Sequence, residues 1–192
     1  YSDSFNCLII PRTCLAVLHH AVILSATRRA NKLLPRTIMI RIVIKRLGRE
    51  LITSIIRIIT SSTQPPKCAI AAPSFSGYER AVKAYGAGIV YYELDSNNGF
   101  SYEYVSGRLE QLDVQLCFIC NPNNPTGNII PENILINILD ICRRRNIIVV
   151  ADECFLRFNR NYEKISCKRF LKDYNNLVII NGRNKAWISH EL

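Results

Sequence analysis

The sequence predicts an α/β fold, with a mostly parallel β-sheet and helices on both faces of the sheet. Several short runs are apolar at every position rather than at alternate positions, which is typical of strands buried on both faces. Stretches with helical periodicity separate these runs, and strands that alternate with helices usually pair in parallel. The 192 residues, 48% of them hydrophobic, are enough to form a sizeable core.

From residue 67 onward, strands and helices follow one another regularly. Short strands are expected at residues 68–72, 88–94, 114–119, 146–151 and 177–180. Apolar residues recur with helical spacing between them, which predicts helices at residues 76–85, 104–112 and 131–145. Ser76 is a candidate N-cap of the first helix, and residues 97–99, Asn-Asn-Gly, predict a turn.

The N-terminal part of the chain has a different composition. Residues 1–60 hold ten Lys or Arg against two acidic residues, a surplus of eight within the total net charge of +10. Helical periodicity is present at residues 50–59, whereas residues 5–45 have no clean period. We therefore divide the chain into a basic segment, 1–60, and an α/β unit, 67–192. Because the basic residues alternate with long apolar stretches, no nucleic-acid partner is expected.

The cysteines indicate a cytoplasmic protein with free thiols. Eight cysteines are present and no signal-peptide pattern occurs at Tyr1, which is typical of a reducing compartment. Cys117 and Cys120 have C-x-x-C spacing, but they lie in an apolar run without a second pair or a histidine cluster. We expect buried thiols and no metal site. Every long apolar stretch is interrupted well before the roughly 20 residues of a membrane span, so no membrane association is expected.

Four side chains of different chemistry come just after four of the predicted strands: Phe75, Asn124, Asp152 and Lys185. The carboxyl ends of parallel strands share one edge of a sheet, so these side chains are expected to converge there. Each alone has an ordinary structural explanation, and only the ordered set indicates a site. The set suits pyridoxal 5′-phosphate: a lysine forms a Schiff base, an acid keeps the pyridine nitrogen protonated, an amide donates to the phenolic oxygen and an aromatic ring stacks on the cofactor ring.

The most specific motif is the turn at residues 120–127, Cys-Asn-Pro-Asn-Asn-Pro-Thr-Gly. Further motifs are Ala-Pro-Ser-Phe-Ser-Gly-Tyr-Glu-Arg-Ala at residues 72–81, Asp-Glu-Cys-Phe at 152–155 and the stretch 170–179 that leads to Lys185. Together they resemble the fold-type I pyridoxal-phosphate enzymes of the class I/II aminotransferase group. The chain is most similar to the branch that holds threonine-phosphate decarboxylases and histidinol-phosphate aminotransferases. The resemblance implies a partial large domain whose C-terminal small domain is missing.

The resemblance also implies a role for each residue of the set. Lys185 would form the Schiff base, Asp152 would pair with the pyridine nitrogen, Asn124 would bond the phenolic oxygen and Phe75 would stack on the ring. Tyr1 would reach the phosphate of the neighbouring subunit in a homodimer. The substrate would be a small amino acid or an amino-acid phosphate.

Phe155 discriminates between the two enzymes of this branch. Histidinol-phosphate aminotransferases usually carry Tyr at this position, and its hydroxyl adds a second hydrogen bond to the phenolic oxygen. The decarboxylases often carry Phe. The resemblance therefore favours a threonine-phosphate decarboxylase of cobalamin biosynthesis, with a histidinol-phosphate aminotransferase as the alternative.

The region expected to bind phosphate departs from the family pattern. Residues 45–49 read Lys-Arg-Leu-Gly-Arg where the family has Gly-Asn-Gly-Ala, and bulky side chains obstruct the approach of phosphate to backbone N–H groups. Gly182 and Asn184 stand where hydroxyl residues are expected. A truncated, non-catalytic remnant is thus a second alternative. A nucleic-acid-binding module, suggested by the basic N-terminal segment, is a third.

Overall fold

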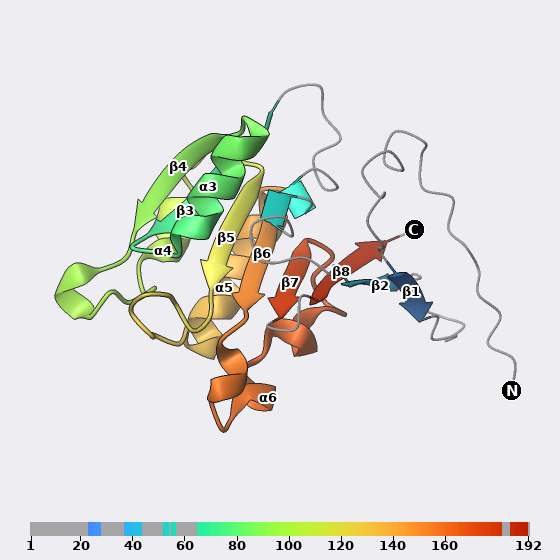
Figure 1. Ribbon diagram of the computed structural model, residues 1–192. Helices are drawn as coiled ribbons and strands as arrows, with labels where there is room; N and C mark the ends of the chain where they lie inside the picture. Colours follow the sequence, from blue (N-terminus) through green and yellow to red (C-terminus); the bar gives the residue numbers. More distant parts are fainter. Residues whose placement is uncertain are drawn as a thin grey trace, which may run out of the picture.

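The computed structural model describes residues 23–27, 37–43, 52–53, 55–56, 65–181 and 185–191. Its sheet has eight strands in the order β1-β2-β8-β7-β6-β5-β3-β4 (Figure 1). The five strands that pair in parallel are β3 (Lys67–Ala72), β4 (Gly88–Glu93), β5 (Leu116–Cys120), β6 (Ile148–Glu153) and β7 (Leu177–Asn181). The structure confirms the predicted α/β class.

Three further strands extend the sheet by antiparallel pairing: β1 (Ile23–Thr27), β2 (Thr37–Val43) and β8 (Lys185–Glu191). β8 returns alongside β7, and β2 pairs with β8 along its whole length, from Thr37 opposite Glu191 to Val43 opposite Lys185. Two strands thus lie in the N-terminal region for which the sequence showed no clean period. The division into segments 1–60 and 67–192 stays a prediction.

The continuous apolar runs form strands because both faces of the sheet are covered. Every residue of β5 is buried. Leu116 and Phe118 face one core, whereas Cys117 and Ile119 face the other. Cys117 and Cys120 likewise belong to opposite cores, since an odd spacing along a strand reverses the face. A strand in this setting needs apolar side chains at every position.

Helices cover the two faces, as predicted. α3 (Ser76–Tyr85) packs on one face together with the helical residues 52–53 and 55–56. α4 (Val105–Leu109) and α5 (Glu132–Arg144) pack on the other face, which carries the larger core. α5 matches its predicted range closely, because its apolar stripe is long and Pro131 stands at its N-cap.

Several predicted boundaries were wrong. Ser76 is the first residue of α3 rather than its cap; Phe75 is the N-cap residue, and its side chain makes no capping hydrogen bond. α4 is only five residues long, since polar residues follow its two buried positions, Val105 and Leu109. β6 continues through Asp152 and Glu153, because both carboxylates find hydrogen-bond donors inside the fold.

The segment between β6 and β7 holds three short helical elements: η2 (Leu156–Phe158), α6 (Tyr162–Ile165) and η3 (Cys167–Phe170). α6 lies beyond the arrowhead of β6, at the carboxyl end of the parallel strands (Figure 1). Between β4 and α4, residues 96–99 contain the turn expected at 97–99, with η1 (Ser96–Asn98) followed by Gly99 in the left-handed conformation at φ 59°. Asp95 caps η1 by accepting a hydrogen bond from the Asn97 backbone N–H.

The described cysteines are buried thiols, apart from the half-buried Cys154, as the sequence predicted. The described residues include no cluster of three or more His, Cys, Asp or Glu side chains suited to a metal ion. None of the described helices has the length and the apolar character needed to cross a membrane.

Candidate active site

Asp152 is the central residue of the carboxyl edge. It is the penultimate residue of β6 and is only 8% exposed. Its Oδ2 accepts a hydrogen bond of 2.7 Å from the Tyr78 hydroxyl, and its Oδ1 accepts one of 2.9 Å from the Cys154 backbone N–H. Both donors are neutral. Among the described residues no Lys, Arg or His forms an ion pair with this carboxylate, so a buried negative charge stands here without a cation.

The Asp152 carboxylate contributes to raised pKa values of three neighbouring groups. Burial, followed by the nearby Asp152 carboxylate, raises the pKa of the Tyr78 hydroxyl well above its ordinary value. The same two causes, in the same order, raise the pKa of the Cys120 thiol to about 11 and raise that of Cys154 further. All three groups are therefore protonated at neutral pH, and neither thiol is a nucleophile.

The turn at residues 120–127 is fixed to the site by two buried asparagines. The backbone N–H of Asn121 donates to the Asp152 carbonyl oxygen at 2.9 Å, which ties the turn to β6. The Asn123 Nδ2 donates to the Pro73 carbonyl oxygen at 3.2 Å and to the Thr126 hydroxyl oxygen at 3.0 Å. This second asparagine thereby joins the turn to the chain just after β3.

Asn124 and Phe75 are both half-buried beside these anchors. Within the described part of the chain, the Asn124 side-chain amide forms no hydrogen bond, so its donors and its acceptor can meet a ligand. The Phe75 ring packs edge-on against Tyr78, with ring centroids 5.5 Å apart at 86°. Both side chains thus combine a fixed backbone with partial exposure, which is typical of ligand-contacting residues.

Lys185 is the first residue of β8 and pairs with Asn181, the last residue of β7. Asn181 in turn pairs with Glu153, the last residue of β6. The backbone of Lys185 therefore lies at the same edge of the sheet as Asp152, two strands away. Tyr1, residues 45–49, Gly182 and Asn184 lie outside the described residues.

Glu153 is a second buried carboxylate, 1% exposed, next to the site. It accepts hydrogen bonds from the Ser166 hydroxyl at 2.7 Å and from the Cys167 backbone N–H at 2.5 Å. These bonds fasten the start of η3 to the end of β6. Glu153 therefore holds the helical segment that follows the site rather than facing a ligand.

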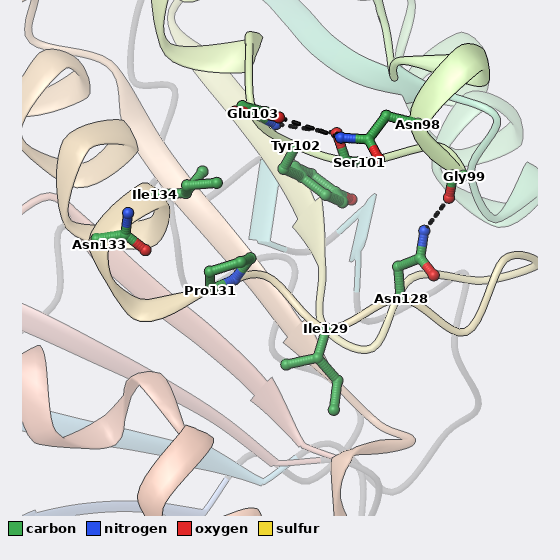
Figure 2. Close-up of a pocket in the computed structure, with 10 residues that line it drawn as sticks. All are labelled: Asn98, Gly99, Ser101, Tyr102, Glu103, Asn128, Ile129, Pro131, Asn133 and Ile134. Carbon is green, nitrogen blue, oxygen red and sulfur yellow. Dashed lines mark hydrogen bonds between the residues drawn. The ribbon is translucent and has the colours of Figure 1, made fainter.

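A separate cleft of about 560 Å³ lies between the turn at residues 98–103 and the start of α5 (Figure 2). Figure 2 shows Asn128 bonded to the Gly99 carbonyl oxygen across one end of the cleft. Tyr102 lines it, and the Tyr102 hydroxyl donates to the Asn123 Oδ1 at 3.2 Å, so the cleft touches the back of the 120–127 turn. None of the predicted site residues lines this cleft, and we do not place the active site there.

Sequence reasoning missed the contacts of two site residues, Tyr78 and Asn123. The sequence placed Tyr78 only within the helix predicted at residues 76–85, and Asn123 only within the motif at residues 120–127. The signal for Tyr78 is weak: it stands three residues after Phe75, on the same side of the helix start. Its partner is 74 residues away in the sequence, so no local pattern identifies it.

The residues at this edge suit a pyridinium ring. Asp152 offers a buried anionic acceptor with no described cation, which matches a protonated ring nitrogen. Phe75 offers an aromatic surface, and Asn124 offers an amide free of described partners. Lys185 brings an amine-bearing residue to the same edge.

Comparison with known proteins yields a family match. A model of the family described as aminotransferase class I and II matches residues 50–189. A histidinol-phosphate aminotransferase from Ruminiclostridium cellulolyticum is 34% identical over 117 residues, which are 60% of this chain and 31% of that protein. A proposed threonine-phosphate decarboxylase from Caldanaerobacter subterraneus is 37% identical over 119 residues, 60% of this chain and 32% of that protein.

Solved structures share the fold. The histidinol-phosphate aminotransferase from Clostridium acetobutylicum superposes with a TM-score of 0.58 at 25% identity, covering 74% of this chain and 42% of that one. The PLP-bound C-S lyase from Staphylococcus hominis, in a complex with L-cycloserine, gives 0.59 at 19% identity, covering 75% and 40%. The chain spans about a third of the length of the curated relatives named above.

Proposed function

This chain belongs to the aminotransferase class I and II family, and from that premise we propose that it binds pyridoxal 5′-phosphate at the carboxyl edge of its sheet and takes part in PLP-dependent catalysis. The observation that carries the proposal is the buried Asp152 carboxylate, which has two neutral donors and no described cation. A protonated pyridine nitrogen would place a positive charge beside this carboxylate. The fold shared with a PLP-bound lyase supports the same site.

Bound pyridoxal phosphate supplies an electron sink for bonds to the α-carbon of an amino acid. In this proposal Asp152 holds the proton on the pyridine nitrogen, and Phe75 orients the ring by stacking. Asn124 donates from Nδ2 to the phenolic oxygen. Lys185 would hold the cofactor through Nζ, and the same amine would hold or move the proton at the α-carbon of the substrate.

Phe155 supports threonine-phosphate decarboxylation as the reaction. It follows the end of β6 by two residues and is 51% exposed, so an aromatic ring without a hydroxyl is available at this edge. A Tyr at this position would add a hydrogen bond, as expected of a histidinol-phosphate aminotransferase. The relatives named for each reaction have similar identity, 37% and 34%, so histidinol-phosphate transamination is the second candidate.

We further propose that the enzyme is a cytoplasmic homodimer and that it acts on a small molecule. The resemblance of the first residues supports the dimer, with Tyr1 reaching the phosphate held by the neighbouring subunit. The buried thiols support a reducing compartment.

The first test is reconstitution of the purified 192-residue chain with pyridoxal phosphate. We expect a visible absorption band. Lys185→Ala should abolish it, because the amine that would hold the cofactor is removed, whereas the matched control Lys172→Ala should retain it, because Lys172 is an exposed lysine. If the protein is well folded and the band is absent, the proposal is contradicted, and the alternative of a non-catalytic remnant is favoured. If the band forms, the two reactions are told apart by their substrates. Release of CO₂ from threonine phosphate indicates decarboxylation, and transfer of the amino group from histidinol phosphate indicates transamination.

A further inference from the structure

The Tyr78 side chain donates a hydrogen bond to Asp152. It is fully buried on the inner face of α3, and the distance between its hydroxyl oxygen and Asp152 Oδ2 is 2.7 Å. The Cys154 backbone N–H holds the other carboxylate oxygen at 2.9 Å. With both oxygens held, the plane of the carboxylate is fixed before any ligand arrives.

The Tyr78 ring is itself locked by contacts from two other elements. It stacks on Phe118 of β5 with ring centroids 5.2 Å apart at 14°, and it packs edge-on against Phe75. The Tyr78 backbone N–H donates to the Phe75 carbonyl oxygen at 3.1 Å. One residue therefore links the aromatic expected to stack on the cofactor, the strand that leads into the 120–127 turn, and the carboxylate.

The Tyr78 hydroxyl keeps its proton and so remains a donor to Asp152. Burial and the adjacent Asp152 charge both raise the pKa of Tyr78 well above its ordinary value, so the O–H stays protonated across the working range of an enzyme. A donor that cannot ionise gives the carboxylate the same partner at every such pH. A hydrogen bond to a charged group is about twice as strong as one between neutral groups.

We propose that Tyr78 is a positioning residue, which orients the Asp152 carboxylate toward the pyridine nitrogen of the cofactor. This inference rests on the proposed function above. Tyr78 acts through Asp152 and does not touch the reacting atoms. Without its O–H, the carboxylate keeps its charge but loses one of its two fixed contacts, so it can rotate away from the ring nitrogen.

The test compares Tyr78→Phe with Tyr92→Phe in the 192-residue chain. The first change removes the hydroxyl and keeps the ring contacts with Phe118 and Phe75. Tyr92 is the matched control: it is also buried, and its hydroxyl donates to the Phe118 carbonyl oxygen at 2.6 Å, in the opposite core. Cofactor affinity is measured by absorbance titration. The ring nitrogen is followed by NMR with ¹⁵N-labelled pyridoxal phosphate, and thermal unfolding confirms that each variant is folded.

We expect Tyr78→Phe to weaken cofactor affinity about threefold to tenfold and to shift the ¹⁵N resonance, while Tyr92→Phe leaves both unchanged. In an Asp152→Asn background, Tyr78→Phe should add no further loss, because the charged acceptor is gone. Wild-type affinity and an unmoved resonance in Tyr78→Phe would overturn the inference. An equal loss in the Asp152→Asn background would do so too, since it would assign the effect to packing.

Tyr78→His serves as a second variant, because the imidazole keeps a ring N–H donor. Affinity between those of the wild type and Tyr78→Phe supports the proposal, whereas affinity no better than that of Tyr78→Phe counts against it. If the wild-type chain binds no cofactor, both the proposed function and this inference are contradicted. If the wild type binds and Asp152→Asn weakens binding but Tyr78→Phe does not, only the inference fails.

Discussion

At the scale of single residues, two adjacent carboxylates at the end of β6 serve different purposes. Asp152 and Glu153 are both buried, and they point to opposite faces of the sheet because side chains alternate along a strand. Asp152 meets the Tyr78 hydroxyl and faces the proposed ring pocket. Glu153 meets Ser166 and Cys167 and fastens the chain that follows. We propose that Asp152 is held for a ligand, whereas Glu153 holds the fold together.

Glu153 makes the stability of the fold depend on pH. Burial raises its pKa above the ordinary value of 4.5, more than its bonds to Ser166 and Cys167 lower it. The folded protein therefore binds this proton more tightly than the unfolded chain. The resulting stabilisation is complete below pH 4.5 and is lost as the pH rises through the raised pKa.

The neutral variant Glu153→Gln removes this dependence. As the pH rises above 4.5, the free energy of unfolding of the wild type should fall relative to that of Glu153→Gln. Urea unfolding at a series of pH values checks this. Glu163→Gln, at an exposed position of α6, is the control and should run parallel to the wild type. Parallel curves for wild type and Glu153→Gln would contradict the assignment.

At the scale of elements, Gly86 at the end of α3 and Gly107 inside α4 have opposite effects on helix stability. Gly86 ends α3 at φ 78°, where its backbone N–H donates to the Lys83 carbonyl oxygen at 3.0 Å. Gly107 lies inside α4, and a Cβ added there meets no atom within 4 Å. The left-handed conformation favours glycine at Gly86, whereas a helix interior disfavours it at Gly107.

We therefore expect Gly86→Ala to lower the free energy of unfolding by about 1–2 kcal/mol. Gly107→Ala should raise it by about 0.5–1 kcal/mol. Neither change creates a clash, so each serves as the control of the other. Chemical denaturation measures both, and equal signs for the two variants would refute the backbone explanation.

Each element could be predicted to the extent that the signals and contacts that form it lie within its own stretch of sequence. α5 was predicted to within a residue at each end because its periodicity, proline and basic last turn all lie within its own sequence. The end of β6 was placed too early, since Asp152 and Glu153 look like turn formers until their distant donors are known. β2 had no signal, because its pairing with β8 connects residues more than 140 positions apart.

At the scale of the whole molecule, the parallel order of β3, β5, β6 and β7 brings the candidate residues to one edge. Lys185 lies at the same edge because β8 begins there, opposite the last residue of β7. The set Phe75, Asn124, Asp152 and Lys185 was predicted from the sequence because each follows or ends a strand. Their proposed roles stay predictions.

A ligand that binds the folded chain alone must stabilise it. At a free concentration of about 100 times its Kd, pyridoxal phosphate should raise the free energy of unfolding by about 2.7 kcal/mol. A thermal-shift titration measures this, and Asp152→Asn should need more cofactor for the same shift. A wild-type transition that does not move with cofactor concentration would exclude binding to the folded state.

The sequence by itself determined the alternation of strands and helices, the motif at residues 120–127 and the family, because these are written in local patterns and residue identity. Only the tertiary structure decided which groups hold the two buried carboxylates and how the sheet continues beyond β7. The physical reason is that a buried charge is hydrogen-bonded by whichever donors the fold brings to it. The positions of those donors follow no periodic pattern in the sequence, so they cannot be predicted from it. Tyr78, expected as a core aromatic, is the clearest case.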